Sequence, residues 1–217
     1  MGFRTLGIST IVAMALVVSA LAGCSQLPYQ TAANISSHSN SVQAKTREVA
    51  GRVDKTMTAL ATLINKPAGS LGSGFKNFSD QLGALKNGYA SLKNAINNVT
   101  GNQANYMAIW EKQIQSIGDS DIQAAAKSNY AAAQRDFSHF TKRSMATEAS
   151  GGKFMAYLNN MKKYLSTDLS SSGLKGASHL LGNAKSRSKT FLHDLGKLGN
   201  DAARLSKDLN PVAGSAK

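Results

Sequence analysis

The residue best suited to covalent chemistry is Cys24, the only cysteine among 217 residues. A secreted domain that uses cysteine for stability normally carries an even number, because each disulfide needs two thiols. A lone cysteine has no such partner within the chain. A covalent modification needs none, so the residues around Cys24 decide how its thiol is used.

The segment before Cys24 has the three parts of an export signal. A short start carries Arg4, an uncharged apolar run follows from Leu6 to Leu21, and the small residues Ala22 and Gly23 come last. The run is shorter than the ~20 residues that cross a ~30 Å hydrocarbon core, and a polar segment follows it. We therefore expect residues 1–23 to be a removable signal peptide.

The sequence Leu21-Ala22-Gly23-Cys24 resembles the bacterial lipobox. This resemblance implies that the Cys24 thiol receives a diacylglyceryl group, that the chain is cut before Cys24, and that the new amino end is acylated. The alternative is an ordinary secretory signal whose cleavage site lies beside a cysteine. Ser25 follows Cys24, where lipoproteins that stay in the inner membrane of a Gram-negative cell carry aspartate. In such a cell the resemblance to these sorting signals implies a lipid-anchored protein of the outer membrane, facing the periplasm.

The remaining 194 residues are strongly basic. Loss of Arg4 changes the net charge from +13 to +12. Such a charge attracts anionic partners. Outside the cytoplasm these are lipid headgroups, lipopolysaccharide phosphates and acidic cell-wall polymers, and we expect no nucleic acid partner.

A second group of candidate residues recurs every four positions near the C-terminus. Lys185, Lys189, His193 and Lys197 would share one face of a helix and form a strip, and Arg204 would extend it. Closely spaced cations create a local potential that a single lysine does not. The strip therefore predicts contacts with an anionic ligand, and the alternative is an ordinary solvated helix face.

Other residue patterns argue against catalysis and against metal binding. The histidines lack the i,i+4 spacing that places two ligands on one helix face; they are His38, His139, His179 and His193. The glycine-rich stretch before Phe75 differs from a phosphate-binding loop, because Asn77 stands where that loop has serine or threonine. We expect no enzyme activity, no metal and no cofactor.

The elements that position these residues are helical. Apolar residues step by three and four from Phe75 to Val99, and the same frame continues to Ile117. A second such seam runs from Leu181 to Leu209 and ends before Pro211. Shorter stripes occupy 42–64, 122–140 and 154–165, and the last two form either one bent helix or two helices separated by Gly151 and Gly152.

Short breaks separate these segments, at 67–74, 118–120 and 170–173. Short connections make neighbouring helices antiparallel. The sequence therefore predicts an all-α fold, an elongated antiparallel helical bundle over 41–210. Residues 24–40 are polar and include Pro28, which predicts a flexible tether, and 211–217 form a C-terminal tail. The oligomeric state stays open.

Three stretches carry a resemblance to a known family. They are Tyr106-Met107-Ala108-Ile109-Trp110-Glu111, the segment from Tyr130 to Phe140, and the segment from Phe154 to Leu174. Together they resemble an uncharacterised family of predicted helical envelope lipoproteins of bacteria. The resemblance implies long helices and an envelope location, and it implies no activity.

Two classes of function follow. The first is a structural or protein-interaction lipoprotein that binds other envelope proteins through its helix surfaces. The second is a protein that binds anionic envelope lipid, lipopolysaccharide or cell-wall polymer through the strip of basic residues near the C-terminus. Binding through ion pairs should weaken at high ionic strength, whereas docking of apolar helix surfaces should not.

Overall fold

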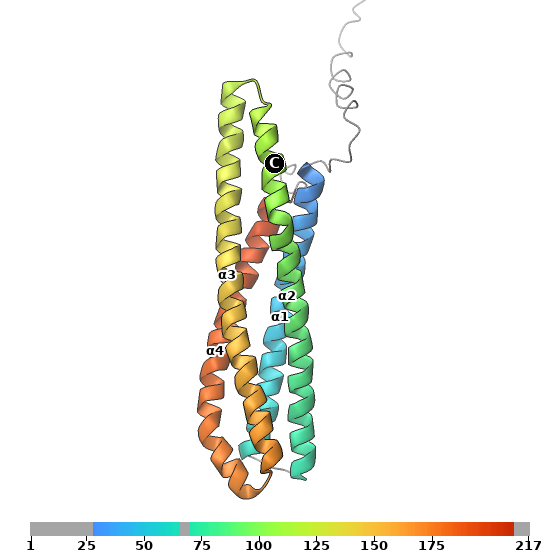
Figure 1. Ribbon diagram of the computed structural model, residues 1–217, viewed down its shortest axis with the longest axis vertical. Coiled ribbons are helices and arrows are strands. Elements are labelled where there is room, and N and C mark those ends of the chain that lie inside the picture. The colour runs from blue at the N-terminus through green and yellow to red at the C-terminus, as the bar shows by residue number, and fades with distance from the viewer. Residues whose placement is uncertain (1–27, 66–69, 211–217) are drawn as a thin grey trace, which may run out of the picture.

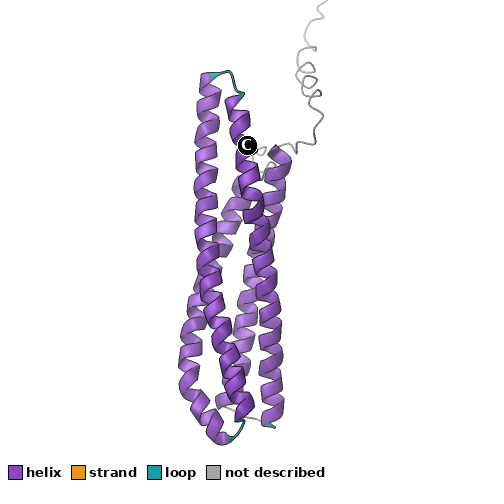
Figure 2. Ribbon diagram, in the orientation of Figure 1, coloured by secondary structure: helices purple, strands orange, loops and turns teal. Residues whose placement is uncertain are grey.

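The computed structural model describes residues 28–65 and 70–210, which fold into four long helices (Figure 1). These are α1 (Pro28–Asn65), α2 (Leu71–Gln115), α3 (Ser120–Thr167) and α4 (Ser171–Asp208). The described ranges contain no strand, and short loops separate α2 from α3 and α3 from α4 (Figure 2). The prediction of an all-α helical bundle is confirmed.

Successive helices run antiparallel and close into a ring of four. Helix α1 packs against α2 and α4, and α3 packs against α4 and α2, so that α1 and α3 lie diagonally opposite. The bundle is elongated, and the hairpin of α2 and α3 extends beyond the start of α1 and the end of α4 (Figure 1). One end of the molecule is therefore a two-helix projection.

The two predicted apolar seams supply much of the core. In α2 the seam from Phe78 to Val99 is buried except at the half-buried Tyr89, and in α4 the seam from Leu181 to Leu209 is buried along its whole length. Phenylalanine side chains fill the interior and are fully inaccessible to solvent: Phe78, Phe137, Phe140, Phe154 and Phe191. Each seam faces a neighbouring helix, as heptad spacing requires.

Polar side chains cap three helices at the predicted breaks. The hydroxyl of Ser70 accepts a hydrogen bond from the backbone N–H of Ser73, and Ser170 accepts one from Gly173. The carboxylate of Asp119 accepts from the N–H groups of Asp121 and Ile122. These bonds satisfy N–H groups that a helix start leaves without partners.

The predicted tether is wrong for residues 28–40, because α1 begins at Pro28. Ile35 is fully buried, and Thr31, Ser36 and Ser39 are buried beside it. The Ser36 hydroxyl donates to the backbone carbonyl of Ser206 in α4 at 2.9 Å. Small polar side chains thus form an inner helix face here. The proposed signal peptide, residues 24–27 and the tail 211–217 lie outside the described residues.

The glycine pair at 151–152 lies inside one continuous helix, α3, which settles the question of one helix or two. Gly151 is buried against the rings of Tyr89 from α2 and Phe191 from α4. A Cβ atom at this position would lie 2.7 Å from the Tyr89 ring and 2.8 Å from the Phe191 ring. The glycine therefore permits a close approach of three helices.

Candidate functional site

Cys24 lies outside the described residues, but it comes shortly before the start of α1 in the sequence. Only Ser25, Gln26 and Leu27 separate it from Pro28. The start of α1 is thus the described part of the chain that is closest to Cys24 in the sequence. This end of the molecule is the one from which the α2–α3 hairpin projects (Figure 1).

The predicted strip of Lys185, Lys189, His193 and Lys197, here named the α4 strip, lies on the outer side of α4, opposite the buried seam. Lys185, Lys189 and His193 are exposed, and Lys197 is half-buried. No ion pair joins these lysines to a carboxylate in the described part of the chain. The three lysines of the strip thus keep their charge available to an external ligand.

Arg204 differs from the strip because it has partners inside the bundle. Its guanidinium lies 2.6 Å from a carboxylate oxygen of Asp201 and 3.5 Å from one of Asp136 in α3. Arg143 of α3 lies 3.5 Å from Asp201 in turn. These pairs join α3 to α4, while the Arg204 side chain remains 50 % exposed, so its contact with an external anion stays a prediction.

Arg187 is a cation that the four-residue spacing did not include. It lies on the α3 side of α4, with its guanidinium carbon 4.9 Å from the centre of the Tyr157 ring. The Tyr157 hydroxyl donates to the carbonyl of Leu180 at 2.9 Å, which fixes the ring across the α3–α4 groove. A cation over an aromatic face is attracted by the ring quadrupole.

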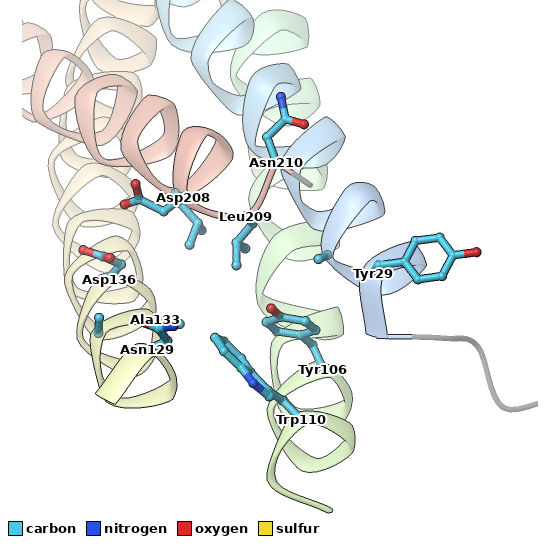
Figure 3. A pocket seen from close by; sticks show the side chains of 12 residues that line it. Tyr29, Tyr106, Trp110, Asn129, Ala133, Asp136, Asp208, Leu209 and Asn210 are labelled. Atoms are coloured by element: carbon cyan, nitrogen blue, oxygen red, sulfur yellow. The ribbon is translucent and has the colours of Figure 1, made fainter. Parts of the chain in front are cut away.

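A cavity of about 540 Å³ lies where α1 begins and α4 ends, between these ends and the α2–α3 hairpin (Figure 3). Aromatic side chains of Tyr106 and Trp110 form one wall, and Tyr29 lies at its edge. Trp110 is half-buried and packs edge-on against Tyr130 with ring centres 5.7 Å apart. Burial raises the pKa of the Tyr106 hydroxyl to about 12.

The opposite wall of this cavity carries two carboxyl groups, Asp136 and Asp208. Partial burial, followed by the negative charge of Asp136, raises the pKa of Asp208 above its ordinary value. The twelve lining residues include no histidine, lysine or cysteine. The cavity therefore pairs an aromatic wall with two carboxyl groups.

Across residues 28–65 and 70–210, no group of three or more histidine, cysteine, aspartate and glutamate side chains has the arrangement of a metal site. In the same ranges no helix combines the length and hydropathy needed to cross a bilayer. Comparison with protein-family models, with curated proteins and with solved structures finds no match for this chain. A function for this chain is therefore inferred from its own residues and their arrangement.

Proposed function

We propose that this protein is a lipid-anchored helical bundle of the bacterial envelope that acts as a structural or protein-interaction module, without catalysis. The lipobox-like ending at Cys24 and the absence of any other cysteine support the anchor. Several acyl chains on one residue hold a protein stably, since each buried methylene contributes ~0.8 kcal/mol. The resemblance to envelope lipoproteins agrees with this location.

The observation that carries the proposal is the short distance between the anchor cysteine and the first helix. With α1 beginning at Pro28, four residues after Cys24, the lipid attaches almost directly to a rigid bundle. The 38 residues of α1, which run from the anchor to the far end, correspond to a length of about 57 Å at 1.5 Å per residue. Such a molecule holds its far end at a defined distance from its lipid, as a spacer or scaffold does.

Exposed apolar side chains on the outer helix faces are the candidate contacts for protein partners. Met145 of α3 is 68 % exposed, Ile122 near the hairpin tip is 60 % exposed, and Leu180 of α4 is 36 % exposed. They are separated along the molecule rather than gathered in one patch. This favours contacts with partner helices at several levels over one large interface.

The second candidate function is binding of an anionic envelope ligand through the α4 strip. The outward direction of Lys185 and Lys189, and the lack of ion pairs to them in the described residues, favour it. Ionic strength separates the two functions. Binding through the strip should fall steeply as salt rises, whereas apolar helix docking should change little.

The anchor itself is tested by Cys24→Ala in the native host. Labelled palmitate should enter the wild-type protein and be absent from the variant, which should also accumulate as the unprocessed precursor. A matched variant, Ser25→Ala, keeps the thiol and should be labelled normally. Equal labelling of wild type and Cys24→Ala would overturn the proposed anchor.

A further inference from the structure

We propose that the far half of the α3–α4 hairpin, residues 153–189, is a docking surface for an anionic cell-wall polymer. The surface is named here the distal basic hairpin. It includes Lys185 and Lys189 of the α4 strip and adds the cations of α3. The end of α3 and the beginning of α4 form it. These two segments lie side by side because the helices fold back on each other.

The distal basic hairpin holds a charge imbalance found nowhere else in the bundle. Seven cations and one carboxylate, Asp168, fall within its 37 residues. The other described residues carry 15 cations and 11 carboxylates, so most of the excess positive charge resides here. The cations are Lys153, Lys162, Lys163, Lys175, Lys185, Arg187 and Lys189.

These cations have no internal partner among carboxylates. Lys162 is half-buried and the other six are exposed, and no ion pair in the described residues includes any of the seven. Nearer the other end of the same two helices, Arg143 and Arg204 are both paired with aspartates. Lys142 of α3 and Lys197 of α4, outside the hairpin, also lack an ion pair in the described residues, so the local excess of charge distinguishes the distal basic hairpin. Repulsion among its unpaired cations is relieved by a bound polyanion.

Tyrosine rings lie among the cations in the groove between the two helices. Tyr157 and Tyr164 are fixed by hydrogen bonds from their hydroxyls to the carbonyls of Leu180 and Gly173, at 2.9 and 3.2 Å. The Tyr164 residue remains 38 % exposed and Leu180 36 % exposed. A surface that alternates charge with rigid aromatic faces suits a glycan, whose sugar rings also present apolar faces, better than it suits a small inorganic ion.

The place of the hairpin along the molecule selects the source of the anion, and this step rests on the proposed lipid anchor. Thr46 of α1 contacts Gly199 of α4, which sets the two helices in register. Counting 1.5 Å per residue from Pro28 to Thr46, and from Gly199 back to Lys189 and Lys175, places the cations about 40–60 Å from the start of α1.

That separation exceeds by several times the ~8 Å over which salt screens exposed charges. If the long axis of the bundle is perpendicular to the bilayer that holds the lipid, the cations are too far from this bilayer to attract its headgroups. They are then close to a polymer layer that lies at that distance from the membrane. A bundle that lies flat on its own bilayer is the competing arrangement, which would present the same cations to lipid headgroups.

The test uses residues 24–217 with Cys24→Ser, made without the leader so that no acyl chain contributes to binding. The distal variant replaces four exposed lysines with glutamine: Lys153, Lys163, Lys175 and Lys189. The control variant makes the same four-charge change elsewhere: Lys93, Lys112, Lys127 and Lys142. All eight are exposed helix positions, where glutamine is a good helix former, and circular dichroism confirms that both variants fold.

Binding is measured by sedimentation with purified peptidoglycan sacculi and, separately, with vesicles containing anionic phospholipid. We expect the distal variant to bind sacculi about tenfold more weakly than wild type at low ionic strength, and the control variant to stay within about twofold. Equal binding of sacculi by the two variants would overturn the proposal. A selective loss on vesicles alone would also overturn it, and would assign the surface to a membrane. Neither outcome bears on palmitate labelling of Cys24, so the anchor stands or falls separately.

Discussion

The neighbouring glycines of α3 should respond in opposite ways to the same substitution. Gly152 is exposed, and a Cβ atom there would meet nothing within 4 Å. At Gly151 the added Cβ would lie 2.7 Å from the Tyr89 ring and 2.8 Å from the Phe191 ring. Both positions are helical, so Gly151→Ala and Gly152→Ala change the backbone preference equally and differ in packing.

The expected magnitudes follow from two terms. Alanine is favoured over glycine in a helix by about 1 kcal/mol, so Gly152→Ala should raise the free energy of unfolding by about that amount. In Gly151→Ala the same gain is opposed by overpacking, which costs ~1–3 kcal/mol in a close-packed interior. The gain in helix preference is the same in both variants. The difference between their free energies of unfolding, about 1–3 kcal/mol, therefore measures the cost of overpacking at Gly151.

The upper part of that range is expected because neither ring can move freely. The Tyr89 hydroxyl donates to the carbonyl of Glu148 at 2.9 Å, and Phe191 is fully buried against Phe154 with ring centres 6.0 Å apart. Urea unfolding followed by circular dichroism gives the free energies. Thermal midpoints should differ by ~2–4 °C per kcal/mol for a chain of this size. If Gly151→Ala stabilised the protein as much as Gly152→Ala, the proposed close packing of α2 and α4 on α3 would be refuted.

Three further predictions concern α1, the acidic cavity and the α4 strip. Ile35→Ala should lower the free energy of unfolding by ~2–5 kcal/mol in urea titrations, because the side chain is fully buried, whereas a flexible tether would show no change. Burial and the neighbouring Asp136 raise the pKa of Asp208, so ionised Asp208 destabilises the fold as pH rises through this raised value. Asp208→Asn should therefore raise the thermal midpoint at neutral pH and leave it nearly unchanged near pH ~3, where both states are protonated; equal gains at both pH values would contradict this. Replacing the three lysines of the α4 strip with glutamine should leave stability nearly unchanged and weaken binding to anionic vesicles at low salt if the second candidate function holds, and unchanged binding would leave an ordinary solvated face.

Heptad periodicity was sufficient to predict the long helices. It places the apolar residues on one face of a helix, and that face is buried against a neighbouring helix whichever helix the neighbour is. It failed at the start of α1, where the inner face consists largely of Thr31, Ser36 and Ser39 around Ile35. A hydrogen-bond acceptor lowers the cost of burying a hydroxyl; in the described residues Ser36 has one, whereas the buried hydroxyls of Thr31 and Ser39 have no hydrogen-bond partner. For Ser36 that acceptor is a backbone carbonyl 170 residues away, which no local pattern reveals.

The glycine pair was equally ambiguous in the sequence. Glycine is unfavourable inside a helix, so Gly151 and Gly152 are compatible with a bend in one helix or with a break between two helices. The rings that require a missing side chain at Gly151 come from α2 and α4. Their approach depends on the tertiary arrangement of three helices, which heptad spacing leaves undetermined.

Part of the candidate site could be read from the sequence and part could not. The outward face of the α4 strip follows from its position opposite an apolar seam. The pairing of Arg204 with Asp136 depends on the register of α3 against α4, and the sequence contains no direct signal for it. The distal basic hairpin did have a signal, the single carboxylate between 153 and 189, which a search for regular spacing passes over.

The central claim is that lipid on Cys24 holds one end of this bundle at a membrane. The most direct measurement is mass spectrometry of the amino-terminal peptide of the protein purified from its native envelope. A chain that begins at Cys24 and carries the mass of a diacylglyceryl group, with or without a further acyl chain on its amino group, is the result predicted here. A mature chain that begins elsewhere, or an unmodified Cys24, would contradict the anchor and the upright arrangement built on it.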